Sequence, residues 1–254
     1  MREIKFLSLV VPAFKQQKTI VRDIKNLNNV LSPLPIEYEI IVVVDGFIDK
    51  TFENVQRIKS KNIKVVGYEK NHGKGFAVRY GMQRAKGDII GFIDSGMDIE
   101  PTGIAMLLNH MIWYDADIIV GSKLHPVSQV NYPLWRKIIS WGYRNFTHLF
   151  FGFKIKDTQV GLKIFRKDVA KDVLPRLLIK RFAFDVEMLA VAYSLGYKRI
   201  FEAPIKLKFT GSSSVPTYKS KNFWKLILGM LIDTLAVYYR LKILHYYDSN
   251  NKKK

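Results

Sequence analysis

The 254-residue sequence contains no cysteine, so it forms neither disulfide bonds nor thiolate metal sites. Its first residues, MREIKFLSLVVPAF, also lack the basic, apolar and small-residue order of a cleaved signal peptide. These two absences lead us to expect a protein of the cytoplasmic compartment.

Acidic residues are scarce. Asp and Glu number 22 against 41 Lys and Arg, and the formal net charge of +19 favours encounters with nucleic acid, anionic lipid or phosphate-bearing substrates. The sequence has no dense basic helix, no RNP-type aromatic motif and no zinc-ligand spacing, so we expect no nucleic-acid partner. Aromatic residues make up 13% of the chain and favour a surface that meets lipid, because Trp and Tyr suit the headgroup boundary.

A long uncharged apolar run is also missing. Two segments of helical length, 134–155 and 222–247, are rich in Trp, Tyr, Phe and Leu, yet neither holds the roughly 18 uncharged residues that a membrane span needs. Asp233, Arg240 and Lys242 interrupt the second segment. Both are predicted either to lie in the membrane interface, which is the better physical fit, or to be ordinary core helices. The terminal NNKKK adds attraction to anionic headgroups.

No internal repeat, low-complexity linker or Pro/Gly/Ser-rich hinge divides the chain, so we predict one domain with a C-terminal appendage. Short, β-branched, almost wholly apolar runs alternate with helical stretches such as 18–31 and 51–59. The runs are FLSLVVPAF, YEIIVVVDG, NIKVVGYEKN, DIIGFIDSG and ADIIVGSKL. Buried strands that alternate with helices predict an α/β fold in which helices flank a mostly parallel sheet.

Ligands of such sheets bind at the carboxyl ends of the strands, so the polar residues that follow the strands are the candidates. DSGMD at 94–98 follows the run IIGFI, where Asp94 would suit a hard divalent cation, although an acidic turn is also a common structural feature. NHGKG at 71–75 leads into a helix, which favours either a phosphate contact through Lys74 or a plain helix N-terminus. It is not a P-loop, because the GxxxxGK[ST] spacing is absent.

The order of several motifs identifies a family. VVPAF, EIIVVVDG, NHGKGFAVRYGM, GFIDSGMD, DIIVGSK, IKDTQVGLKIFRKDV, RFAFDVEML and EAPIKLKFTGSSSVP together resemble the family 2 glycosyltransferases of GT-A fold. Within this family, the chain is similar to the branch that transfers a hexose from a nucleotide sugar to dolichyl or another polyprenyl phosphate. DTQVGLKIF with RFAFDVEML resembles the dolichyl-phosphate glucosyltransferases more than the mannosyltransferases.

The resemblance implies a Rossmann-like GT-A domain over 1–216, followed by an amphipathic interface helix and basic tail over 217–254, with 134–155 as a first interface helix. It also implies a donor site for UDP-glucose or GDP-mannose, formed by Pro12, Ala13, Asp45, Asn71, Gly73, Lys74, Asp94 and Ser95. Asp94 and Asp98 are the implied ligands of Mg²⁺ or Mn²⁺. The second carboxylate of the family's D-x-D motif falls on Gly96, which offers no ligand, and Val44 and Ser213 are further departures.

On the acceptor side, the resemblance implies that Lys123, Arg136 and Lys208 hold the lipid phosphate. Lysine at two of these positions keeps the charge but loses the bidentate fork of arginine. The same motifs give active-site positions to three carboxylates, namely Asp157, Asp185 and Glu187.

A phosphate monoester is already an anion, so as a nucleophile it needs little help from a general base. We therefore predict in-line attack on the anomeric carbon with inversion, while the metal on Asp94 stabilises the departing nucleotide diphosphate. The expected product is a hexosyl lipid, with glucose favoured and mannose next, made at the cytoplasmic surface of a membrane. Two alternatives stay open: transfer to a saccharide hydroxyl with Asp185 or Glu187 as base, and a non-catalytic relative that binds nucleotide sugar or lipid phosphate. A membrane-protein partner, as some relatives have, stays open too.

Overall fold

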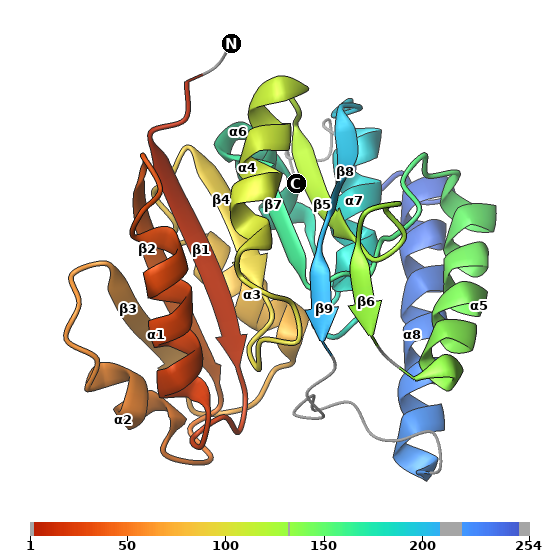
Figure 1. Cartoon of the computed structure of the whole chain (residues 1–254). Helices are drawn as coiled ribbons and strands as arrows, with labels where there is room; N and C mark the ends of the chain where they lie inside the picture. Colours follow the sequence, from red (N-terminus) through yellow and green to blue (C-terminus); the bar gives the residue numbers. More distant parts are fainter. Residues whose placement is uncertain (1–2, 132, 209–219, 249–254) are drawn as a thin grey trace.

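The computed structural model describes residues 3–131, 133–208 and 220–248 (Figure 1). The predicted domain boundary after residue 216, and Ser213, lie outside these residues. The described chain forms a central sheet with helices on both faces and two further helices beside its β8 edge.

Seven strands form the central sheet in the order β3-β2-β1-β4-β7-β5-β8. Their bounds are β1 (Phe6–Ala13), β2 (Glu37–Asp45), β3 (Ile63–Tyr68), β4 (Ile89–Ile93), β5 (Ile118–Ser122), β7 (Leu162–Arg166) and β8 (Ile200–Pro204). Every pairing is parallel except those of β7, which runs antiparallel to β4 and β5. The prediction of a mostly parallel sheet in an α/β fold is therefore confirmed.

Helices cover both faces of the sheet because the five inner strands bury side chains on both sides. Leu7, Leu9 and Val11 of β1 belong to the core that faces α1 and α4, whereas Val10 and Phe92 belong to the core that faces α3, α6 and α7. The bounds of the covering helices are α1 (Ile20–Leu31), α2 (Thr51–Gln56), α3 (Lys74–Met82), α4 (Gly103–Trp113), α6 (Lys167–Val173) and α7 (Phe184–Ser194), with a 3₁₀ turn at Leu174–Arg176. Complete burial on both faces is what makes the strand runs almost wholly apolar.

Two long helices, α5 (Leu134–Phe151) and α8 (Lys221–Lys242), lie side by side at the right of Figure 1. They run in the same direction, with contacts in register from Trp135–Phe223 through Tyr143–Thr234 to Phe150–Tyr238. A small parallel sheet of β6 (Gln129–Asn131) and β9 (Lys206–Lys208) lies between them and the central sheet.

Both helices end earlier than the sequence predicted. α5 stops at Phe151 because Gly152 takes up a left-handed backbone with φ +60°. α8 stops at Lys242, and a turn with His245 at φ +48° brings Tyr247 into the core, where it is completely buried. Within the described ranges, no helix combines the length and apolarity that crossing a membrane requires.

The carboxyl end of β1 is paired on one side only. β1 pairs with β2 as far as Ala13 but with β4 only as far as Val10. The order also changes direction between these strands, since β2 and β3 follow on one side of β1 and β4 on the other. Ligands of open α/β sheets bind at such a switch point.

Candidate active site

Asp94 lies directly after β4, at the carboxyl edge that β1, β2 and β4 share. Its backbone N–H donates to the carbonyl of Gly161, 2.8 Å away. A Cβ on residue 161 would lie 2.0 Å from Asp94 Oδ2, so any larger residue there would displace this carboxylate. The loop before β7 therefore forms one wall around the Asp94 carboxylate.

Lys74 begins α3, and its Nζ lies 2.7 Å from Asp94 Oδ1. Both side chains are partly exposed, 18% for Lys74 and 38% for Asp94. Burial lowers the pKa of the Lys74 ammonium, but the carboxylates of Asp94 and Asp185 outweigh it and hold the pKa above the usual 10.5. Lys74 is therefore a permanent cation beside Asp94, as a contact for an anionic diphosphate requires.

The turn after Asp94 gives a physical reason for the glycine at position 96. Gly96 has φ +88° and Met97 has φ +54°, so both residues take up left-handed backbone, which costs glycine least. Asp98 follows this turn, and its backbone carbonyl accepts a hydrogen bond from the Lys208 N–H at 2.8 Å. The predicted ligand pair therefore flanks a sharp turn at the strand end.

The donor set fits a divalent cation that takes most of its ligands from a bound molecule. The parts of the chain that the structure describes contain no group of three or more His, Cys, Asp or Glu side chains that could hold a metal ion. Asp94 and Asp98 would supply hard carboxylate oxygens, the ligands that Mg²⁺ and Mn²⁺ prefer, and the 38% exposure of Asp94 would let substrate oxygens complete the coordination.

Asp45, at the end of β2, organises the loop that precedes α3. Its carboxylate accepts hydrogen bonds from the Tyr68 hydroxyl (2.9 Å), the Asn71 amide (2.8 Å) and the backbone N–H groups of His72 (2.8 Å) and Gly73 (3.0 Å). The structure thus brings together three of the residues predicted around the donor, and it shows the Asp45 carboxylate fixing the loop.

Pro12 and Ala13 are the last two residues of β1, and Ser95 follows Asp94 at the same edge. The N–H that proline lacks is not needed for pairing with β4, because that pairing ends at Val10. All the residues predicted around the donor therefore lie at the carboxyl edge of neighbouring strands, in the loop that leads into α3 or at the first residue of α3.

A second charged pair lies in the core, between Lys163 on β7 and Asp185 on α7. Both side chains are almost completely buried. Lys163 Nζ donates to the Asp185 carboxylate and to the Val160 carbonyl, 2.6 Å away. Burial lowers the pKa of Lys163 and raises that of Asp185, and each shift is opposed by the partner's charge. Asp185 is thus engaged inside the domain, next to the loop that touches Asp94.

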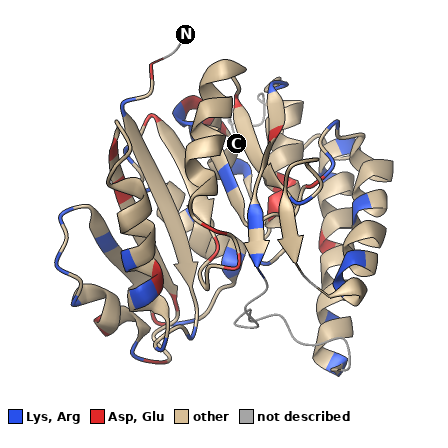
Figure 2. Ribbon diagram, in the orientation of Figure 1, with Lys and Arg blue, Asp and Glu red and all other residues tan. Residues whose placement is uncertain are grey.

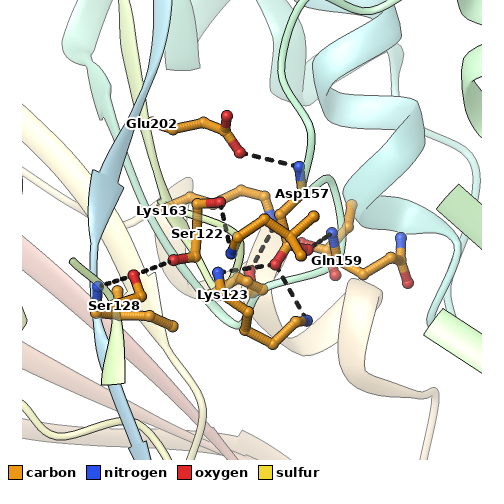
Figure 3. A network of polar contacts seen from close by, with 11 residues as sticks. Ser122, Lys123, Ser128, Asp157, Gln159, Lys163 and Glu202 are labelled. Carbon is orange, nitrogen blue, oxygen red and sulfur yellow. Dashed lines mark hydrogen bonds and ion pairs between the residues drawn. The ribbon is translucent and has the colours of Figure 1, made fainter. Parts of the chain in front are cut away.

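Asp157 is the centre of a third network (Figure 3). Its Oδ2 accepts from the Lys123 N–H at 3.0 Å and lies 3.3 Å from Lys123 Nζ, and its Oδ1 accepts from the Gln159 N–H at 3.3 Å. The Asp157 N–H donates to Glu202 Oε1 at 3.0 Å. Asp157 is 5% exposed, and its carboxylate contacts both the backbone N–H and the ammonium group of Lys123.

Glu187 is placed differently from Asp185, although both lie on α7. Its carboxylate accepts from the backbone N–H groups of Leu178 and Ile179 and from the Tyr247 hydroxyl at 2.7 Å. Burial raises the pKa of this carboxyl, against the opposing effect of those hydrogen bonds. Glu187 therefore fastens the segment after α8 to the domain.

The predicted acceptor cations divide into two groups. Lys123 and Arg136 both border a cavity of about 270 Å³. Lys208, which is 65% exposed, pairs with Glu100 at 3.1 Å and does not belong to the described lining of that cavity. The structure therefore brings two of the three predicted cations to one cavity.

This cavity has an apolar wall and a polar side. The wall comes from α5 and α8, through Trp135, Ile139, Tyr143, Phe223, Ile227 and Met230. The polar side comes from Lys123, Arg136, Arg144, Lys156, Asp157 and Gln159, and Asp98 also borders the space. The arrangement suits a ligand with an anionic head and an apolar tail.

Sequence reasoning missed four of these residues: Lys163, Arg144, Lys156 and Gln159. Arg144 follows Arg136 by about two helical turns, so helical periodicity contained a signal for it. A lysine inside the apolar strand LKIF was a signal for Lys163, because a buried lysine needs a buried acid. Nothing in the sequence distinguishes Lys156 or Gln159 from ordinary loop residues.

Comparisons with known proteins identify the family of the chain. The model of the glycosyl transferase family 2 matches residues 8–174. A dolichyl-phosphate beta-glucosyltransferase of Dictyostelium discoideum is 32% identical over 205 residues, which are 75% of this chain and 63% of that protein. A human dolichyl-phosphate beta-glucosyltransferase is 28% identical over 262 residues, 94% of this chain and 78% of that protein. The chain thus spans a little under two thirds of the first of these relatives.

Solved structures share the fold. Glucosyl-3-phosphoglycerate synthase from Mycobacterium tuberculosis in complex with UDP has a TM-score of 0.68 at 14% identity, over 92% of this chain and 80% of that one. Mannosyl-3-phosphoglycerate synthase from Rubrobacter xylanophilus has a TM-score of 0.69 at 15% identity, over 94% and 75%. From the match over residues 8–174 and the sheet that carries it, we conclude that the chain belongs to glycosyltransferase family 2 and has the GT-A fold.

Proposed function

We propose that the chain is an inverting glycosyltransferase that transfers a hexose, glucose in preference to mannose, from a nucleotide sugar to a polyprenyl or dolichyl phosphate. The observation that carries this proposal is the cavity, where Lys123 and Arg136 border an apolar wall built by α5 and α8. An acceptor with an anionic head and an apolar chain matches both halves of it. The names of the relatives from Dictyostelium discoideum and human support the same sugar and acceptor.

The donor diphosphate belongs at the crevice after β1 and β4. Lys74 contributes a permanent cation there, and the Asp45-bound loop through Asn71 and Gly73 forms the neighbouring wall. Asp94 and Asp98 would hold Mg²⁺ or Mn²⁺, which when bound supplies positive charge to the departing diphosphate. The neighbour from Mycobacterium tuberculosis, crystallised with Mn²⁺ and UDP-glucose, supports a divalent metal and a UDP donor.

In the proposed reaction, an oxygen of the acceptor phosphate forms a bond to the anomeric carbon while the bond from that carbon to the diphosphate breaks. Lys123, held by Asp157, and Arg136 position the attacking phosphate. No residue has to remove a proton, because the nucleophile is already an anion. Asp185 and Glu187 are 2% and 0% exposed and are engaged in the core, which argues against either as the base for a hydroxyl acceptor.

A membrane surface is the proposed working place, at the cytoplasmic leaflet and without a membrane span in the described chain. Large apolar residues recur every three or four positions along α8 and are exposed there: Trp224, Leu228, Ile232, Leu235 and Tyr239. α5 adds Leu134 at 74% exposed and Leu149 at 80%. Figure 2 shows Lys and Arg along both helices, as binding to anionic headgroups requires.

The test is a transfer assay with the purified protein, a polyprenyl phosphate and Mg²⁺ or Mn²⁺, in which UDP-glucose, GDP-mannose and other nucleotide sugars are supplied one at a time. Mass spectrometry should find a hexosyl lipid phosphate from one donor. Asp94→Asn should abolish most of the product, whereas Asp168→Asn should not, because Asp168 is exposed in the first turn of α6 at the opposite edge of the sheet. Nucleotide-sugar binding without any product would support the non-catalytic alternative, and product only with a free saccharide would support the hydroxyl acceptor.

A further inference from the structure

One polar group in the active-site cavity has no hydrogen-bond partner among the described residues. It is the side-chain amide nitrogen of Gln159, which is buried from solvent and belongs to a cavity-lining residue. Its neighbours are satisfied: Asp157 accepts from Lys123 and from the Gln159 backbone. A buried donor without an acceptor is costly, so the amide is expected to find its acceptor in a ligand.

The backbone around Gln159 connects the two halves of the active site. At one end, Asp157 holds Lys123, the proposed cation of the acceptor side. At the other end, Gly161 lies against the carboxylate of Asp94 on the donor side. Figure 3 shows the Gln159 side chain extending away from the Asp157–Lys123 pair. Gln159 therefore stands between the sites of the two phosphates.

During the proposed reaction, the transferred sugar also lies between the two phosphates. In an in-line displacement the anomeric carbon lies between the leaving oxygen of the diphosphate and the attacking oxygen of the acceptor phosphate. Fixed cations, Lys74 and Lys123, serve the two phosphates. A neutral amide donor between them matches a neutral hydroxyl group.

We propose that Gln159 is a specificity-determining residue whose side-chain amide donates a hydrogen bond to one hydroxyl group of the transferred hexose. The inference rests on the proposed function, since it takes the two flanking sites as those of donor diphosphate and acceptor phosphate. A polar site built to bind a hydroxyl rejects the analogue that lacks it, so this contact would select among hexoses that differ at one carbon.

Gln159→Met tests the contact, because methionine has similar length and no N–H group. With the full nucleotide sugar, kcat/KM should fall about five- to tenfold, as expected for one neutral hydrogen bond. The kcat/KM values of wild type and Gln159→Met should then be compared with donors whose hexose lacks the hydroxyl at position 2, 3, 4 or 6. For one of these donors, the two proteins should have equal kcat/KM. Gln129→Met is the matched control, since Gln129 is exposed on β6 and outside the described cavity lining, and it should change nothing.

Stability provides a second readout. The Gln159 amide nitrogen has no hydrogen-bond partner in the described parts of the chain, so Gln159→Met should melt at or above the wild-type temperature. An equal loss for all four deoxy donors, or a loss confined to the KM of the lipid phosphate, would overturn the proposal. A protein that transfers no hexose would refute the proposed function instead. The equilibrium affinities of wild type and Gln159→Met for the deoxy donors would then be measured. If both proteins rank these donors in the same order of affinity, the proposed hydrogen bond is also refuted.

Discussion

Replacing Lys163 by methionine removes the cation of a buried pair and leaves the Asp185 carboxylate, 2% exposed, without its nearest counterion. It also leaves the Val160 carbonyl without the Nζ donor that now lies 2.6 Å away. Removal of one partner from a buried ion pair costs about 3–5 kcal/mol. Lys74 still offsets part of the Asp185 charge, so we expect a loss of about 3 kcal/mol in the free energy of unfolding.

Urea unfolding followed by tryptophan fluorescence measures this loss, provided that the dependence of the free energy on urea keeps its slope. The matched variant is Lys163→Met with Asp185→Asn, which removes the remaining charge with little change in shape. The double variant should regain at least about 1 kcal/mol of the loss. A single variant that loses less than about 1 kcal/mol, or a double variant less stable than the single one, would refute the reasoning about the uncompensated charge.

Three further outcomes are expected. Gly161→Ala should reduce hexose transfer about 100-fold, because its Cβ would lie 2.0 Å from Asp94 Oδ2. Gly142→Ala should keep full activity, because its Cβ would meet no neighbouring side chain or distant backbone within 4 Å. Equal rates for the two variants would contradict the close approach of residue 161 to Asp94. Burial raises the pKa of the Glu187 carboxyl above 4.5. The difference in unfolding free energy between wild type and Glu187→Gln should therefore favour wild type most below pH 4.5 and shrink as the pH rises through the raised pKa. A difference in urea midpoints that stays constant with pH would contradict this prediction. Leu228→Asp, 59% exposed on α8, should weaken flotation with anionic liposomes without changing the melting temperature, and unchanged flotation would exclude this face as the membrane contact.

Local sequence patterns were sufficient to predict the fold class and the edge of the sheet where the site lies. Apolar runs that alternate with helical stretches predicted the mostly parallel sheet, because strands buried on both faces are mostly apolar. The position of Asp94 followed from the same pattern, since it comes directly after β4. Helix ends were less well predicted, as α8 stops at Lys242 so that Tyr247 enters the core.

Which charges meet was decided by tertiary structure alone. Lys163 and Asp185 are 22 residues apart, Lys123 and Asp157 are 34 apart, and the contact that occupies Glu187 spans 60 residues. Asp185 and Glu187 share a motif, yet two residues along a helix turn the side chain by about 200°, so one faces the active-site loop and the other the C-terminal segment. The sequence alone thus determined the sheet and the residues at its carboxyl edge, because hydrophobic periodicity is a local property. Pairing of charges and the cavity beside α5 and α8 depend on chain crossings, which bring distant residues together only in the folded protein.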